Sequence, residues 1–227
     1  MAVATVSVLI PTAGQRPEYL AEAVVSAQQQ RVDARLEVIV EHDPTHTGQS
    51  ATVNRAFARC TGDWITVLED DDFYVREDAV GLLLATARLH PEAAAVYSLP
   101  QYVSALGEPV PTPPRLAAWM AAHPRVRWGT FPDGLAMHGS GLLYARTAWD
   151  AVGGWDESIP CCEEYEFHLH LLQTGHTFVA LPVPIMAYRQ HPHQKSGRRN
   201  GSGVGRTSAR RKAVQEILRR RYDEVTV

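Results

Sequence analysis

The sequence has few cysteines, and those it has are not spaced like a disulfide framework or a zinc site. Cys60 stands alone, and Cys161 is followed directly by Cys162. An odd number with one adjacent pair does not match the paired cysteines of small secreted domains. No CxxC-type spacing is present for structural zinc. Cysteine usage therefore predicts a cytoplasmic protein without a disulfide framework.

Long apolar runs and a strong net charge are missing as well. No stretch reaches the roughly 18 apolar residues that a membrane-spanning helix needs, so no transmembrane segment is expected. The amino-terminal stretch MAVATVSVLIPT lacks the basic start of a secretory signal, and we expect a first strand there. A formal charge of −3 over 227 residues gives no basic field for nucleic acid. One sizeable core is expected from a chain of this length.

Strand and helix patterns alternate in the first part of the chain. Apolar, β-branched runs predict strands at 5–10, 36–40 and 64–68, and apolar residues at helical spacing predict helices at 17–30 and 50–60. This β-α-β-α-β order with short connections is typical of a parallel sheet. Neither GxGxxG nor GxxxxGK[ST] is present, which excludes the dinucleotide fingerprint and the P-loop. A nucleotide would instead lie among the loops that follow the strands at one sheet edge.

The remaining pattern is mixed. We expect helices at 77–89, 115–122, 147–152 and 163–173, strands at 94–99, 141–145 and 177–181, and a loop or hairpin at 100–114. The prolines of 182–184 are expected to end the last of these strands. The segment 195–211 mixes basic side chains with Gly and Ser, and we expect it to be flexible because it cannot bury a core. A final helix is expected after Thr207.

Four consecutive carboxylates, Glu69 to Asp72, follow the predicted strand 64–68 directly. Such a run is costly to bury unless something neutralises it. It therefore forms either an exposed, solvated turn or a site for a divalent cation. Its position at the carboxyl end of a strand favours the cation, because open α/β sheets bind ligands there. Carboxylate oxygens on a short turn suit Mg²⁺ or Mn²⁺, and these ions suit a substrate diphosphate.

Five segments in this order resemble the ordered motifs of inverting family 2 glycosyltransferases of the GT-A fold. They are VSVLIPTAG, EVIVEHD, GDWITVLEDDD, GGWDESIPCCEEYEFHLHLLQTG and YRQHPHQKS. The resemblance covers about Val6 to Ser196. It implies an α/β fold with a Rossmann-like, mostly parallel sheet flanked by helices, followed by a flexible C-terminal segment and a terminal helix. It divides the chain into a nucleotide-sugar-binding half (1–100), an acceptor-binding and catalytic half of the same domain (101–194), and a flexible basic loop with the helix (195–227).

The resemblance places the nucleotide of a UDP-, GDP- or dTDP-sugar at the ends of the first two strands. The matching positions are Pro11, Thr12 and Ala13 in the first loop, His42 and Asp43 in the second, and Arg55 on the helix that follows. The family commonly has Asp-Asp in the second loop, so His42-Asp43 is a departure that leaves the base open. Arg55 is displaced from the usual basic position by two residues, which makes it a weaker match.

The acidic turn matches the metal-binding (DXD) motif of that family. Asp71 is the implied ligand of Mn²⁺ or Mg²⁺, and Asp70 would contact the ribose or the metal. His191, in the YRQHP segment, would complete the metal or diphosphate site, since histidine is a common metal ligand. The alternative for His191 is a surface histidine without a role.

A general base that deprotonates the acceptor hydroxyl is implied at Glu164, beside Glu163 at the start of the helix 163–173. The alternative is that these acids only balance the helix dipole. His138, Trp155 and Asp156 are candidates for the acceptor pocket, although His138 and Trp155 fit a packing role as well.

Two other functions stay open. A sugar nucleotidyltransferase would use a basic residue in the first loop, such as Arg16, to bind a triphosphate. A non-catalytic module would bind a nucleotide or a sugar without turnover. The acceptor can be soluble or lipid-linked, since basic residues from 198 to 221 would each contribute about 1 kcal/mol at an anionic membrane surface. The basic loop 195–206 is either a lid over the diphosphate or a passive tail.

Overall fold

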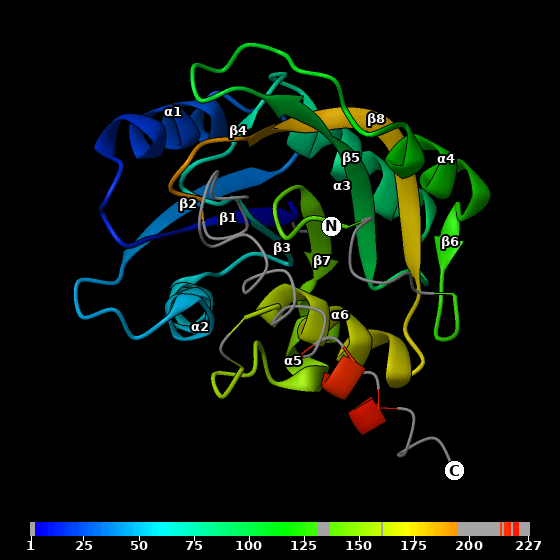
Figure 1. The fold of residues 1–227 in the computed structure, drawn as a ribbon. Helices are drawn as coiled ribbons and strands as arrows, with labels where there is room; N and C mark the ends of the chain where they lie inside the picture. Colours follow the sequence, from blue (N-terminus) through cyan, green and yellow to red (C-terminus); the bar gives the residue numbers. More distant parts are fainter. Residues whose placement is uncertain are drawn as a thin grey trace.

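The computed structural model describes residues 3–130, 137–159 and 161–194, together with residues 214, 216–218 and 220–222. In these residues one mixed sheet forms the centre of the molecule, and helices cover both of its faces (Figure 1). The strand order is β2-β1-β3-β7-β5-β8-β4, and β6 pairs with β8 beside this path. The expectation of an α/β fold with a mostly parallel sheet is confirmed.

The elements follow one another in the expected alternation. The strands are β1 (Thr5–Thr12), β2 (Arg35–His42), β3 (Trp64–Val67), β4 (Phe73–Tyr74), β5 (Ala95–Val103), β6 (Arg125–Val126), β7 (Leu142–Ala145) and β8 (Phe178–Arg189). The helices are α1 (Pro17–Gln28), α2 (Gln49–Arg59), α3 (Ala79–Leu89), α4 (Pro114–Ala122), α5 (Arg146–Val152) and α6 (Glu163–Gln173). The described residues between 214 and 222 are helical, as expected, whereas Thr207 and the segment 195–213 lie outside the described residues.

The first three long strands place three loops at one edge of the sheet. β1 pairs in parallel with β2 and with β3, so that Thr12 lies opposite His42 and Leu9 lies opposite Val67. Because parallel strands end at the same side, the loops after β1, β2 and β3 meet there. The acidic turn that follows β3 therefore lies beside the loop that follows β1, at the same edge of the sheet.

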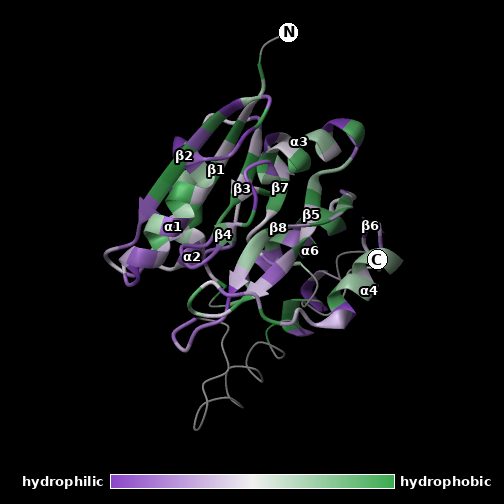
Figure 2. Ribbon diagram, turned by 90° about the horizontal axis from the view of Figure 1, so that it is seen from above, coloured by the Kyte–Doolittle hydropathy of each residue, from purple (hydrophilic) through white to green (hydrophobic). Residues whose placement is uncertain are grey.

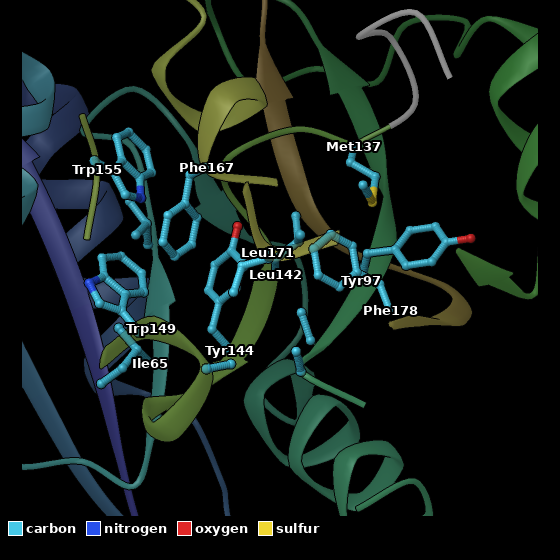
Figure 3. Close-up of a cluster of buried hydrophobic side chains, with 14 of the residues drawn as sticks. Ile65, Tyr97, Met137, Leu142, Tyr144, Trp149, Trp155, Phe167, Leu171 and Phe178 are labelled. Atoms are coloured by element: carbon cyan, nitrogen blue, oxygen red, sulfur yellow. The ribbon is translucent and has the colours of Figure 1, made fainter. Parts of the chain in front are cut away.

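Both faces of the central strands are buried. In β1, Leu9 belongs to the hydrophobic cluster under α2, α5 and α6, and its neighbours Val8 and Ile10 belong to the cluster under α1 and α3. Successive side chains of a strand point to opposite faces, so a strand covered on both sides is apolar throughout. Figure 2 shows hydrophobic residues along the central strands. Figure 3 shows the aromatic part of the first cluster, where the rings of Trp149 and Phe167 lie 4.7 Å apart.

The last strand corrects the sequence prediction. We expected a strand at 177–181 that the prolines of 182–184 would end, but β8 continues to Arg189. It pairs with β5 up to Ser98 opposite Leu181 and again from Pro100 opposite Met186. The prolines lie in the irregular stretch between these two ladders, where no donor is needed. The sequence predicted a loop or a hairpin from residue 100 onward. Residues 100–103 belong to β5 instead, because β5 stays paired with β8 up to Val103.

The short strands β4 and β6 were not expected from the sequence. Each has two residues and pairs only with β8. A two-residue strand carries no periodicity, so only the tertiary pairing reveals it. No helix among the described residues is both long enough and apolar enough to span a membrane. The division of the chain at residues 100 and 194 stays a prediction.

Candidate active site

The acidic turn after β3 is held by a buried arginine at the end of β8. Arg189 donates from its backbone N–H to Asp72 Oδ1 (3.1 Å) and from Nε to the backbone oxygen of Asp71 (2.9 Å). Its guanidinium also pairs with Glu22 on α1 and donates to the Ala105 oxygen (3.0 Å). The Arg189 side chain is only 2% exposed. The Arg189 guanidinium, at the end of β8, therefore links the acidic turn to α1 and to the loop after β5.

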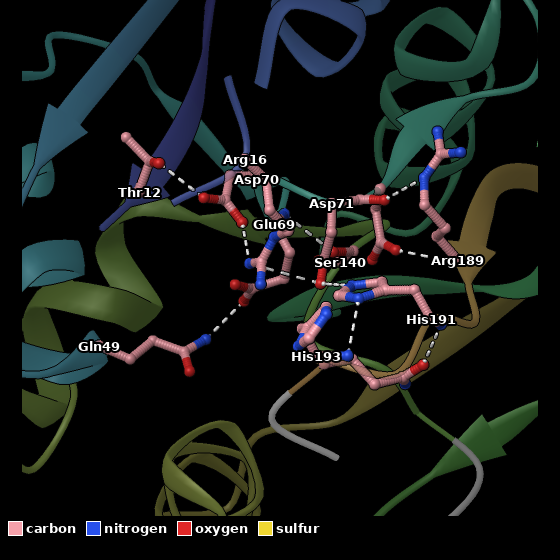
Figure 4. A network of polar contacts seen from close by, with 12 residues as sticks. Thr12, Arg16, Gln49, Glu69, Asp70, Asp71, Ser140, Arg189, His191 and His193 are labelled. Atoms are coloured by element: carbon pink, nitrogen blue, oxygen red, sulfur yellow. Dashed lines mark hydrogen bonds and ion pairs between the residues drawn. The ribbon is translucent and has the colours of Figure 1, made fainter. Parts of the chain in front are cut away.

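Asp70 is bound by the end of β1 and by the loop that follows it (Figure 4). The Thr12 hydroxyl donates to Asp70 Oδ2 at 2.6 Å, and Arg16 Nη2 donates to Asp70 Oδ1 at 2.7 Å. The Gly14 N–H in turn donates to Thr12 Oγ1 at 3.0 Å. The structure thus brings Thr12 and Asp70 together, two of the residues predicted to lie at the nucleotide.

Asp71 faces His191, which follows β8. His191 Nε2 lies 2.9 Å from Asp71 Oδ2, and the histidine side chain is 2% exposed. The Tyr19 ring packs against the imidazole with ring centroids 5.4 Å apart. The structure therefore places two of the three predicted metal ligands in direct contact, with Asp70 as the neighbouring residue.

The described residues hold no group of three or more His, Cys, Asp or Glu side chains arranged for a metal ion. A carboxylate and an imidazole in contact are nevertheless a donor pair that suits Mn²⁺, and Asp70 adds carboxylate oxygens beside them. Such a pair leaves most coordination positions to oxygens of a bound substrate. The residues present therefore fit a divalent cation that binds together with a diphosphate.

Glu69 and Asp72 show how the turn tolerates four carboxyl groups. Burial, with the charge of Asp71 second, raises the pKa of both carboxyls well above their usual values. For Asp72 the Arg189 N–H opposes this rise. Raised pKa values favour protonated carboxyls, so the turn carries less negative charge than its composition suggests. Glu69 is also held by Gln49, whose Nε2 donates to Oε1 at 2.5 Å.

Glu164 lies across a glycine from the acidic turn. A Cβ atom built on Gly139 would lie 3.4 Å from both Cβ and Cγ of Glu164 and 3.9 Å from Glu69 Oε1. A side chain at residue 139 would therefore lie in contact with Glu164 and close to Glu69. Ser140 ties the same segment to the turn, because its Oγ accepts the Glu69 N–H at 3.0 Å. The predicted base thus lies at the same sheet edge as the predicted metal ligands.

The other acids at the start of α6 differ from Glu164 in their burial. Glu163 and Glu166 are buried, at 4% and 2% exposure, whereas Glu164 is half-buried. Glu166 accepts a hydrogen bond from the hydroxyl of Tyr222, in the C-terminal helical residues. Of the three acids in the first turn, Glu164 is the one for which both exposure and position fit a base.

The second loop is organised around Asp43. Its Oδ1 accepts the Thr47 N–H (2.9 Å) and hydroxyl (2.7 Å), and its Oδ2 accepts the Gly48 N–H (3.0 Å). Burial opposes ionisation, but these bonds outweigh it and lower the Asp43 pKa to about 2. Arg55 braces the same loop, with Nε 3.0 Å from Glu41 Oε1 and Nη2 3.6 Å from Asp43 Oδ1. These two residues shape the loop predicted to read the base, whereas His42 is exposed.

The three acceptor candidates occupy different surroundings. His138 Nε2 lies 3.2 Å from the Tyr102 hydroxyl, and its ring packs on Tyr188 at 4.3 Å. Trp155 is 2% exposed and belongs to the core cluster, which fits the packing role. Asp156 accepts hydrogen bonds from the Ser158 hydroxyl and N–H and pairs with an arginine of the C-terminal helical residues. Among the three, His138 belongs to the segment next to the acidic turn.

Sequence reasoning missed several residues of this site. Arg189, Gln49 and Ser140 all contact the acidic turn, yet none was predicted to do so. Arg189 precedes His191 by two residues in the YRQHP segment, which was the available signal. Gln49 and Ser140 lie in no charged or metal-binding pattern, and only the fold reveals their contact with the turn.

Solved structures share this fold. S. aureus TarS residues 1–349 with UDP-GlcNAc gives a TM-score of 0.65 at 14% identity, over 84% of this chain and 60% of that chain. The same TarS fragment without a named ligand gives 0.64 at 15% identity, over 82% and 60%. A mannosyltransferase of Pyrobaculum calidifontis with GDP-Man and Mn²⁺ gives 0.59 at 13% identity, over 83% and 57%. The chain therefore spans 57% to 60% of the length of these three solved structures.

Curated protein sequences give no significant match to the chain. At identities this low, the structural similarity establishes the GT-A type of fold and not a substrate. A family model described as "Glycosyltransferase like family 2" matches residues 5–202. That range contains the acidic turn, His191 and the start of α6. The chain therefore belongs to family 2 of the glycosyltransferases.

Proposed function

We propose that the chain transfers a sugar from a nucleoside diphosphate sugar to an acceptor hydroxyl, with inversion at the anomeric carbon and with a divalent cation as cofactor. One observation carries this proposal. Glu164, at the start of α6, and the acidic turn after β3 lie on the two sides of Gly139. A base and an acidic cation-binding turn at one sheet edge are the two parts that this reaction requires.

The chain's own residues divide the work between donor and acceptor. Thr12 and Asp70, joined by a 2.6 Å hydrogen bond, contact the nucleotide at the end of β1. The loop shaped by Asp43 receives the base. Glu164 removes the proton of the acceptor hydroxyl while its oxygen attacks the anomeric carbon from the face opposite the diphosphate. Inversion follows from that direction of attack.

The cation would be held by Asp71 and His191, whose side chains are in contact at 2.9 Å. A divalent ion there would supply positive charge to the diphosphate that leaves. Mn²⁺ is present in the mannosyltransferase complex with GDP-Man, which supports the same ion here. Three of the similar solved structures hold UDP-GlcNAc, UDP or GDP-Man, so uridine and guanosine are the first bases to test.

The alternatives receive less support. A nucleotidyltransferase would use Arg16 to bind a triphosphate, but the family match favours glycosyl transfer. A non-catalytic binding module predicts nucleotide binding without turnover. It also predicts that Glu164→Gln changes no activity.

Calorimetric titration of the protein with UDP, GDP and dTDP, each with and without Mn²⁺, tests the donor site. We expect one diphosphate to bind tightly with Mn²⁺ and to lose that affinity when EDTA is added. Binding of none of the three in the presence of Mn²⁺ would overturn the proposed function.

A further inference from the structure

Arg16, in the loop between β1 and α1, places a positive charge beside Asp71, which would hold the cation, and beside its neighbour Asp70. Its Nη2 lies 2.7 Å from Asp70 Oδ1 and 3.6 Å from Asp71 Oδ2 (Figure 4). The Arg16 side chain is 20% exposed, so solvent screens these contacts only partly. The guanidinium therefore neutralises the acidic pair in the chain itself.

Arg16 remains charged under all ordinary conditions. A guanidinium group keeps its proton in proteins, so the positive charge of Arg16 is fixed. A second cation that approached Asp70 and Asp71 would meet this fixed charge a few ångströms away. Like charges at that separation repel strongly where water is partly excluded.

One donor of the Arg16 guanidinium is left unused. Nε is buried and has no hydrogen-bond partner among the described residues. Buried donors are nearly always paired in folded proteins, so this N–H is available to an acceptor that a ligand supplies. Guanidinium groups bind carboxylate and phosphate oxygens with the same planar arrangement of N–H groups. Arg16 can therefore exchange its carboxylate partners for the oxygens of a diphosphate.

We propose that Arg16 competes with the divalent cation for Asp70 and Asp71, and that the donor diphosphate draws Arg16 away from them. The inference rests on the proposed function, because it concerns the same donor site. Without a donor, Arg16 weakens cation binding at the acidic turn. With a donor, Arg16 contacts the diphosphate, and the two carboxylates become available to the cation.

This competition makes cation and diphosphate binding cooperative. Each ligand tightens the binding of the other by the same factor, because linkage between two binding sites is reciprocal. Part of that factor arises from direct contact between the cation and the diphosphate. The remaining part arises from Arg16 and disappears when the guanidinium is removed.

The test compares Mn²⁺ binding to the wild-type protein, Arg16→Gln, Arg16→Met and Arg16→Lys. Free Mn²⁺ is measured by electron paramagnetic resonance, first without nucleotide and then with the diphosphate that the wild-type protein binds. Without nucleotide, we expect Arg16→Gln and Arg16→Met to bind Mn²⁺ about tenfold tighter or more than the wild-type protein, because the repulsion is gone. Arg16→Lys keeps the charge and stays near the wild-type value.

The cooperativity factor gives the second result. In the Gln and Met variants, we expect the factor by which the diphosphate tightens Mn²⁺ binding to be about tenfold smaller than in the wild type. These variants have no charge at residue 16 that could repel Mn²⁺, either with or without the diphosphate. Arg31→Gln is the matched control, because Arg31 pairs with Glu77 on the surface and its side chain is 80% exposed. We expect this variant to match the wild-type protein in both measurements.

Equal or weaker Mn²⁺ binding by folded Arg16→Gln or Arg16→Met, without nucleotide, would overturn the inference. The Met variant keeps an unbranched stem and decides the matter if the Gln variant does not fold, as judged by circular dichroism. Failure of the proposed function looks different, because the wild-type protein would then bind no diphosphate with Mn²⁺. The measurements without nucleotide still test Arg16 in that case.

Discussion

His191 Nε2 lies 2.9 Å from Asp71 Oδ2, although 120 positions separate the two residues in the chain. β8 makes this contact possible, because it pairs with β5 up to Arg189, opposite Val103, and Arg189 contacts the acidic turn. The contact pairs a carboxylate with an imidazole, two groups that can bind a divalent cation. It is the reason to place the cation at Asp71 rather than elsewhere along the acidic run.

Asp71→Ala removes one member of this pair, and we expect it to weaken Mn²⁺-dependent diphosphate binding by about 100-fold or more. Residues that only support metal ligands cost about 10- to 100-fold in affinity, so a ligand costs at least as much. Titration calorimetry with Mn²⁺ and diphosphate measures the change. Asp33→Asn is the control, because that carboxylate is 97% exposed and pairs only with surface Arg88. Unchanged binding by Asp71→Ala would remove Asp71 from the cation site.

Gly139→Ala tests the close approach between Glu164 and the acidic turn. The added Cβ would lie 3.4 Å from two atoms of Glu164, at the near limit of ordinary van der Waals contact, and we expect it to displace the glutamate side chain. A displaced base loses alignment with the acceptor, and we expect kcat to fall about tenfold while the Kd of the diphosphate stays the same. Steady-state kinetics and calorimetry measure the two quantities. A wild-type kcat in the folded variant would speak against this position for the base.

Arg189→Gln tests how the acidic turn is held together. The arginine side chain is 2% exposed, and its removal leaves the backbone oxygens of Asp71 and Ala105 without their donor, whereas Glu22 is 45% exposed and stays solvated. We expect the free energy of unfolding to fall by about 2 to 3 kcal/mol, because partly buried acceptors lose their hydrogen bonds. Urea unfolding measures it. Arg88→Gln, which breaks an exposed pair, should cost less than about 1 kcal/mol. Equal losses in the two variants would contradict this role of Arg189.

The pH dependence of stability tests Asp43. Its pKa is lowered from an ordinary value of 3.8 to about 2 in the folded chain, so the stabilisation is present above about pH 4 and is lost as the pH falls toward 2. After allowance for solvent screening, it amounts to about 1 to 2 kcal/mol. The difference in unfolding free energy between wild type and Asp43→Asn should shrink from pH 6 to pH 3. A difference that does not change with pH would show that Asp43 does not stabilise the loop through its charge.

Sequence reasoning predicted much of the structure around β1, the acidic turn and α6. The continuous apolar run of β1 predicts a strand buried on both faces, and the acids after β3 predict a polar turn at the sheet edge. The helix α6 has the predicted bounds, Glu163 to Gln173, because its apolar spacing and acidic first turn are both strong signals. A local sequence pattern is sufficient where the residues of one segment determine its secondary structure without contacts from distant segments.

The contacts around the acidic turn do not follow from local pattern. Arg189 meets groups from α1, from the turn itself and from the loop after β5, and no spacing in the sequence links these segments. The continuation of β8 past its prolines also depends on a distant segment, because its pairing with β5 begins again at Met186. Tertiary pairing overrides the local signals at both places. The role of Arg16 became visible only with the distances to Asp70 and Asp71.

The central claim is that Glu164 is the base of a glycosyl transfer, and Glu164→Gln tests it most directly. Turnover of the nucleotide sugar that the wild-type protein accepts is measured beside the Kd of its diphosphate. Glu18→Gln is the matched control, because Glu18 is an exposed acid in the first turn of α1 and shares only the effect on a helix dipole. We predict that Glu164→Gln lowers kcat at least about 100-fold with an unchanged Kd, whereas Glu18→Gln matches the wild type. Wild-type turnover by Glu164→Gln would contradict the account and favour a role at the helix dipole alone.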